Sequence, residues 1–163
     1  MTTGRRHWGL SSALVVVGTA AAFAYLPAVV ASSVTAGLLI GKYVPPDQRD
    51  QAHVRHYAQR RFTRSFGRLA GALWGLYWWP LARLIPHRNF LSHLPPIGTA
   101  VAFLYLFVPL LAALWWLLAP AVPLAAWLHT WLVNGLALGI LGGWALQDLG
   151  HLAQDGFRFT WRR

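Results

Sequence analysis

The stretch that decides the fold is LPPIGTAVAFLYLFVPLLAALWWLLAPAVPLAAWLHTWLVNGLALGILGGWALQ, residues 94–147, which contains no Asp, Glu, Lys or Arg. A helix that crosses a bilayer needs about 20 apolar residues. Pro120 and Pro123 divide the stretch into two parts, each long enough for one such helix. The sequence therefore predicts two membrane-spanning helices, at about 97–118 and 124–147.

A second uncharged stretch lies near the start of the chain, at residues 10–41. Pro27 interrupts it, so it predicts two shorter spans, at about 9–25 and 28–43. The alternative for this region is a cleavable signal peptide, because two arginines precede the apolar run. The apolar run continues well past a normal signal-peptide core, which favours the two spans.

The composition also favours a membrane protein. Of the 163 residues, 56% are hydrophobic and 11% are charged, whereas a soluble domain carries about 25% charged residues. A disordered basic tail would lack the apolar residues. The chain has no Cys, which excludes disulfides, thiolate metal sites and Cys nucleophiles. The predicted fold class is an all-α integral membrane protein, a single domain over residues 1–163, with four transmembrane helices as two hairpins.

The positive charges predict an orientation in the membrane. The chain has 14 Lys and Arg against 4 Asp and Glu, and four spans place every positive residue on one side. Positive residues near the ends of spans mark the cytoplasmic side. Both termini and the segment 44–93 are therefore expected at the cytoplasmic face of the inner membrane.

The segment 44–93 is predicted to be amphipathic and interfacial. Over residues 53–68 an apolar face lies opposite a basic face at helical spacing. Such a helix binds in the headgroup plane, so the expected partners are anionic membrane lipids and other membrane subunits. Nucleic acid is a less favoured partner, because the apolar face needs an apolar surface to cover it. The basic face carries Arg60, Arg61, Arg64 and Arg68.

Two further patterns concern packing. Residues 69–85, LAGALWGLYWWPLARLI, cluster their aromatic residues next to Pro80, which favours an interfacial or re-entrant segment over a span. Glycines recur at every fourth position in two ladders and predict close contact between helices. The ladders are Gly67-Gly71-Gly75 and Gly135-Gly139-Gly143.

Histidines and carboxylates collect at the predicted cytoplasmic ends of the helices. Imidazole and carboxylate ligands suit zinc, manganese or iron, so their convergence on one side of the membrane predicts a divalent metal site. The expected ligands are His7, Asp47, His87, His93, His151 and Asp155.

The same side chains have interpretations that need no metal. Asp148 or Asp155 could form a salt bridge with Arg88 or Arg158. His129 lies within a predicted span, where an interhelical hydrogen bond is expected. Two more histidines, His53 and His56, are expected to be polar residues of the interface.

Four pieces of the sequence follow one another in a recognisable order. They are Arg6-His7, Pro46-Asp47, the run WWPLARLIPHRNFLSHLPPIGT from Trp78 to Thr99, and His151-Leu152-Ala153-Gln154-Asp155. This order resembles that of an uncharacterised bacterial family of small membrane proteins regarded as metal-binding. It is also similar to the pattern of inner-membrane metal-dependent hydrolases.

The resemblance implies a hydrolase that attacks an ester or phosphoester at the lipid surface with a metal-bound water. In one position the chain departs from the pattern, because Arg49 stands where the family has an acidic residue, two positions after the aspartate of Pro-Asp. A cation there is expected to repel a metal unless Asp50 replaces the missing carboxylate. The alternative function is therefore a non-catalytic membrane subunit or scaffold with a degenerate metal site.

Overall fold

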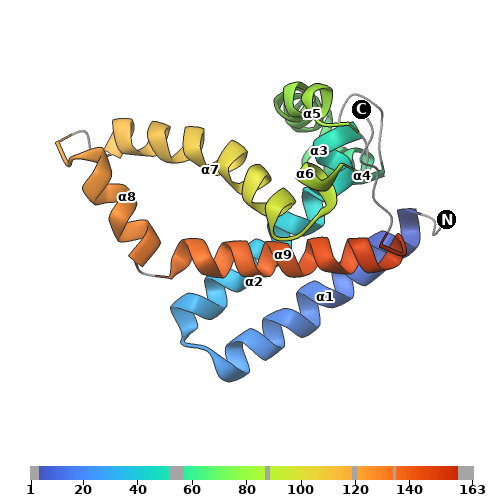
Figure 1. The fold of residues 1–163 in the computed structure, drawn as a ribbon, viewed down its shortest axis with the longest axis horizontal. Helices are drawn as coiled ribbons and strands as arrows, with labels where there is room; N and C mark the ends of the chain where they lie inside the picture. Colours follow the sequence, from blue (N-terminus) through green and yellow to red (C-terminus); the bar gives the residue numbers. More distant parts are fainter. Residues whose placement is uncertain (1–3, 52–56, 87–88, 119–120, 134, 158–163) are drawn as a thin grey trace.

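The computed structural model describes residues 4–51, 57–86, 89–118, 121–133 and 135–157. Within these ranges the regular elements are all α-helices, as the sequence predicted (Figure 1). In chain order they are α1 (Gly4–Tyr25), α2 (Ala28–Tyr43), α3 (Pro46–Gln51), α4 (Tyr57–Phe66), α5 (Arg68–Leu84), α6 (Phe90–His93), α7 (Ile97–Leu118), α8 (Leu124–Val133) and α9 (Leu136–Gln154).

Helices α1 and α2 form a hairpin, and α9 packs along α2 (Figure 1). Glycines allow the close approach of α2 and α9. A Cβ atom added to Gly37 would lie 2.1 Å from the carbonyl oxygen of Ile140, and one added to Gly143 would lie 2.1 Å from that of Val34. Gly139 faces Ser33 in the same way. Two members of the second predicted glycine ladder therefore pack as expected.

The prediction of one helix over residues 124–147 is wrong. The described residues form two helices there, α8 and α9, and Gly135 between them has φ 70° in the left-handed region. A residue with a Cβ rarely adopts this conformation. Figure 1 shows α8 at the end of the molecule away from α6, so α7 and α9 diverge and form no hairpin of two full spans.

Two of the described helices are long and apolar enough to cross a membrane by length and composition. They are α1 from His7 to Tyr25 and α7 from Ile97 to Leu118. In each, 6% of the most apolar window is buried within the molecule. Helix α2, over Ala28–Tyr43, is apolar but shorter.

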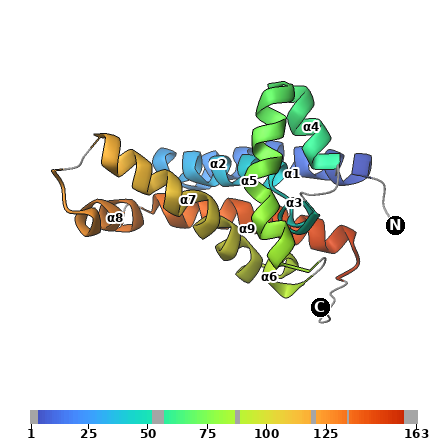
Figure 2. The same cartoon turned by 90° about the horizontal axis from the view of Figure 1, so that it is seen from above.

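In the described residues, the predicted interfacial segment folds into the helices α3 to α6. Figure 1 shows these helices together, toward the end of the molecule where α1 begins and α9 ends. The run 69–85 forms one helix, α5, which contains Pro80. Figure 2 shows α5 crossing the direction of α1 and α9.

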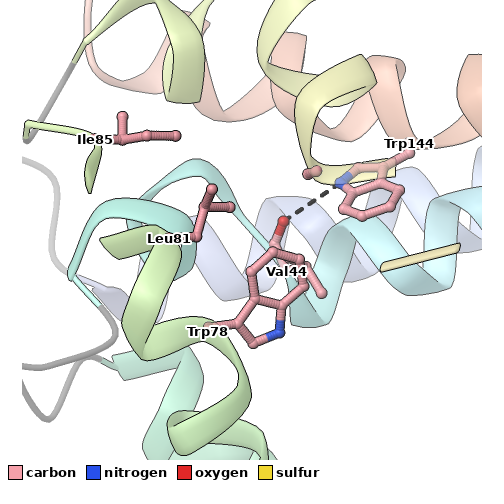
Figure 3. Close-up of a cluster of buried hydrophobic side chains, with 6 residues drawn as sticks. Val44, Trp78, Leu81, Ile85 and Trp144 are labelled. Carbon is pink, nitrogen blue, oxygen red and sulfur yellow. Dashed lines mark hydrogen bonds between the residues drawn. The ribbon is translucent and has the colours of Figure 1, made fainter. Parts of the chain in front are cut away.

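A small apolar core joins α5 to the end of α2 and to α9. Figure 3 shows Val44, Trp78, Leu81, Ile85 and Trp144 packed together, with the indole N–H of Trp144 donating to the carbonyl of Val44 at 3.3 Å. These residues come from the end of α2, from α5 and from α9. The core thus fixes the ends of helices that carry the predicted metal ligands.

Candidate metal centre

Local sequence places His93 at the end of a single helical turn. The side chain of Asn89 caps α6 by accepting a hydrogen bond from the backbone N–H of Leu91 at 3.0 Å. The first turn of α7 then packs against α6, because Gly98 has no Cβ. A Cβ there would lie 2.6 Å from the carbonyl oxygen of Ser92.

Three other helices supply the remaining polar side chains. Asp47 lies in the first turn of α3, directly after Pro46, a residue that suits the start of a helix. His151 and Asp155 are four residues apart at the end of α9, so they share one face. His7 comes from the first turns of α1.

These side chains form a continuous chain of alternating imidazoles and carboxylates, here called the His–Asp centre. Nε2 of His93 lies 3.4 Å from Oδ1 of Asp47, whose Oδ2 lies 3.4 Å from Nε2 of His151. The same Nε2 of His151 lies 3.5 Å from Oδ2 of Asp155. Oδ1 of Asp155 lies 3.5 Å from Nε2 of His7.

The His–Asp centre is largely shielded from solvent. His93 is 1% and His151 is 5% exposed, whereas the Asp47 and Asp155 side chains are 15% and 12% exposed. The His7 side chain is 15% exposed as well, so His7 and the two carboxylates form the more open side of the centre.

Ser92 contacts Nδ1 of His93. The hydroxyl oxygen of Ser92 lies 3.0 Å from the carbonyl oxygen of Asn89 and 2.8 Å from Nδ1 of His93. When the hydroxyl donates its one hydrogen to the carbonyl, its oxygen accepts from Nδ1–H. In the neutral ring Nε2 then carries a lone pair, which faces a carboxylate oxygen of Asp47. Two electron-rich atoms in this arrangement require a cation, either a proton or a metal ion.

The contact between His7 and His151 also places a ring nitrogen with a lone pair next to a carboxylate oxygen. Their Nδ1 atoms are 3.2 Å apart, so one neutral ring donates and the other accepts. The donating ring carries a lone pair on Nε2. Whichever ring donates, that lone pair faces a carboxylate oxygen at 3.4–3.5 Å.

The distances of the centre fit a bound metal ion better than direct hydrogen bonds. N–H···O hydrogen bonds have donor–acceptor distances of about 2.7–3.2 Å, which is shorter than the 3.4–3.5 Å found here. In a tetrahedral zinc site with ligands at about 2.1 Å, neighbouring ligand atoms are about 3.4 Å apart. Two overlapping groups of three have ligand atoms close enough to share an ion: Asp47, His93 and His151, and His7, His151 and Asp155.

Arg49 does not face the centre as an unpaired cation, contrary to the expectation that it would repel a metal. Its buried guanidinium binds both carboxylate oxygens of Asp148 at 2.7 Å. The hydroxyl of Thr99 donates to the same carboxylate at 2.5 Å. Burial raises the pKa of Asp148, while Arg49 and Thr99 act in the opposite direction. The sequence had suggested Arg88 or Arg158 as the partner of Asp148, and both lie outside the described residues.

The Arg49–Asp148 pair connects the helices that carry the His–Asp centre. Arg49 also donates to the carbonyls of Ser92 at 3.0 Å and of Val44 at 3.2 Å. It therefore joins α3 to α6 and to the end of α2, while Asp148 joins α9 to α7. Each ligand of the first group is close in sequence to a member of this network.

The structure brings together five of the six predicted ligands: His7, Asp47, His93, His151 and Asp155. The sixth, His87, lies outside the described residues, as do His53, His56 and the side chain of Asp50. His129 is exposed on α8, away from the centre. Sequence reasoning missed the role of Ser92, although its place next to His93 is a signal that could have revealed it.

The model of the family described as "Uncharacterized metal-binding protein (DUF2227)" matches residues 63–161, more than half of the chain. The chain therefore belongs to this metal-binding family, which confirms that part of the resemblance drawn from the sequence. No curated protein and no solved structure matches the chain.

Proposed function

We propose that this member of the metal-binding family binds a divalent ion of the zinc, manganese or iron class through Asp47, His93 and His151, at a membrane surface. The observation that carries the proposal is the buried His93 ring, whose Nε2 lies 3.4 Å from Oδ1 of Asp47. A metal ion between these two atoms would bind both. Two imidazoles and a carboxylate are three protein ligands, which leaves a coordination position for water or substrate.

The other two residues of the centre have a separate role in this proposal. His7 and Asp155 lie beside His151, with an oxygen of Asp155 3.5 Å from Nε2 of His7. When bound, a zinc-like ion supplies Lewis acidity and a water of lowered pKa, the chemistry of ester and phosphoester hydrolysis. Asp155 would accept a proton at Oδ1, and the neighbouring Nε2 of His7 would stabilise the protonated carboxyl group.

Exposed apolar surface supports the location at a membrane. Soluble proteins rarely expose large continuous apolar patches. On α1, Val16 and Val17 are 69% and 66% exposed, and on α7, Trp116 and Leu118 are 69% and 75% exposed. Lipid chains would cover these side chains, so we propose that α1 and α7 anchor the protein in the inner membrane.

Metal content tests the proposed site. The full chain is purified in a neutral detergent, and its metal content is measured by inductively coupled plasma mass spectrometry. We expect about one metal ion per protein chain. His93→Ala and Asp47→Asn are expected to lose it, because each removes one of three ligands. His129→Ala is the matched control, since this histidine is exposed on α8 and should leave the metal content unchanged. Full metal in His93→Ala would contradict the proposal.

The proposed hydrolysis has its own test. Asp155→Asn is expected to keep the metal but to lose turnover of generic ester or phosphoester substrates, because it removes the proton acceptor. The alternative function is a non-catalytic membrane subunit or scaffold with a degenerate metal site, and it is supported by the engagement of the Asp148 carboxylate with Arg49. Wild-type protein that contains no metal after gentle purification, and shows no turnover, would favour that alternative.

A further inference from the structure

A basic groove lies between α4 and α5, in the part of the molecule that Figure 2 shows standing away from α1 and α9. Its volume is about 590 Å³. Three arginines line it, together with Gln59, Thr63, Gly71 and Ala72. These three, here called the groove arginines, are Arg60, Arg64 and Arg68.

The groove is held by close packing of its two helices. Gly67 has φ 91° and makes the turn that sends α5 back along α4. A Cβ on Gly71 would lie 2.1 Å from the hydroxyl oxygen of Thr63, so the helices touch at this point. The side-chain amide of Gln59 donates to the carbonyl of Gly71. The first predicted glycine ladder thus builds the hairpin, with its first member in the turn.

In the part of the chain that the structure describes, no carboxylate neutralises the groove arginines. The four acidic residues of the chain are Asp47, Asp50, Asp148 and Asp155, so neither α4 nor α5 contains one. Among the described residues, no ion pair joins a groove arginine to a carboxylate. All three side chains are exposed. The groove therefore presents a concentrated positive charge to an external anion.

Arg61, the fourth arginine predicted to contact lipid, differs from the groove arginines. Its guanidinium lies 5.8 Å from the ring centre of Trp8 on α1 and does not line the groove. Arg61 therefore joins α4 to α1, and three arginines remain for an external ligand.

An apolar row lies next to the groove. Leu69, Leu73 and Leu76 recur at helical spacing on α5 and are 76%, 58% and 66% exposed. Phe66, at the end of α4, is 55% exposed. A helix that combines exposed arginines with an exposed apolar row suits the boundary between headgroups and acyl chains.

We infer that the basic groove binds the phosphate of an anionic phospholipid headgroup, with the apolar row directed into the acyl chains. Guanidinium groups match phosphate oxygens with paired hydrogen bonds. The volume of about 590 Å³ is within the range of small-molecule sites. The apolar row makes a lipid a better occupant than a free anion, because it supplies apolar chains to cover the leucines.

Native mass spectrometry of the full chain in a neutral detergent tests this inference. The protein is offered equal amounts of dioleoyl-phosphatidylglycerol and dioleoyl-phosphatidylcholine, and the bound lipids are compared. We expect phosphatidylglycerol to be favoured about tenfold or more, since each arginine near an anionic surface adds to the attraction. The variant R60Q/R64Q/R68Q is expected to lose most of this preference. Arg83→Gln is the matched control, because Arg83 lies on α5 over the Trp79 ring and outside the groove.

Three results would overturn the inference. They are equal binding of the two lipids, an unchanged preference in the triple variant, and displacement of phosphatidylglycerol by equimolar inorganic phosphate, which would indicate a site for small anions. If the triple variant fails to fold, the single variant Arg64→Gln replaces it, and it is expected to lose part of the preference for phosphatidylglycerol. Metal content, measured on the same samples, is expected to stay at the wild-type level, so a failure of the lipid site is distinguishable from a failure of the metal site.

Discussion

At the scale of single residues, the chemistry of the centre depends on where one hydrogen lies. When the Ser92 hydroxyl donates to the carbonyl of Asn89, it accepts from Nδ1–H of His93, and the lone pair of Nε2 is directed toward Asp47. A ligand held by such a partner needs no reorientation when the metal binds. We therefore expect Ser92 to favour the tautomer of His93 whose Nε2 can bind a metal ion.

Ser92→Ala tests this tautomer control. We expect metal affinity to fall about 10- to 100-fold, as is usual when the partner of a ligating histidine is removed. Titration calorimetry with zinc would measure it. The fold should persist, because the change removes one oxygen from a buried site. An affinity equal to that of the wild type would show that Ser92 has no part in positioning the ring.

Arg49 and Asp148 form a second residue-scale feature, and each is fully or almost fully buried. Removing one member leaves the other as a buried charge without its partner, which costs about 3–5 kcal/mol of the free energy of unfolding. We expect Arg49→Leu to show this loss in denaturant unfolding. The double variant R49L/D148L should recover much of it, because no buried charge remains. A single variant as stable as the wild type would contradict the role of the pair.

At the scale of elements, glycine determines where helices touch and where they end. Gly143 contacts the backbone of α2, whereas Gly142 has nothing within 4 Å of a Cβ. Gly135 belongs to the same predicted ladder as Gly143, but its φ of 70° places it between α8 and α9, where the helix breaks. The sequence predicted the ladder but could not separate a packing glycine from a breaking one, because both occur in apolar runs without other signals.

Gly142→Ala and Gly143→Ala are therefore a matched pair. The added methyl at 143 overlaps the carbonyl of Val34, and overpacking of this kind costs about 1–3 kcal/mol. The methyl at 142 meets open space and should leave the unfolding free energy unchanged or slightly raised. Thermal unfolding of the two variants in the same detergent measures the difference. Equal stabilities would contradict the close packing of α2 and α9.

At the scale of the whole molecule, contacts between distant segments build the centre. The hairpin break at Pro27, the start of α7 and the helical segment 44–93 follow from local patterns, so the sequence predicted them. Six ligands were predicted from their positions at helix ends, and the structure brings the side chains of five of them together. The pairing of Arg49 with Asp148, which are 99 residues apart, has no local signal. Arg49 was expected to repel a metal ion, because its pairing with Asp148 could not be predicted from the sequence.

The orientation in the membrane is a further whole-molecule prediction. Single cysteines at Thr3, Gln59 and Thr160 are expected to react with an impermeant thiol reagent from the same, cytoplasmic side. The reason is that α1 begins and α9 ends at the end of the molecule that holds α3 to α6 (Figure 1), and positive residues mark the cytoplasmic side. The chain has no native cysteine to interfere. Labelling of Gln59 from the side opposite to Thr3 would contradict this orientation.

We propose that Asp47, His93 and His151 hold one metal ion, and X-ray absorption spectroscopy of the full chain loaded with zinc tests this most directly. We predict a first shell of nitrogen and oxygen atoms at about 2.0–2.2 Å, with the outer-shell scattering of two imidazoles. His93→Ala, loaded and washed in the same way, should retain no zinc. A spectrum without imidazole scattering, or the wild-type spectrum in His93→Ala, would contradict this site.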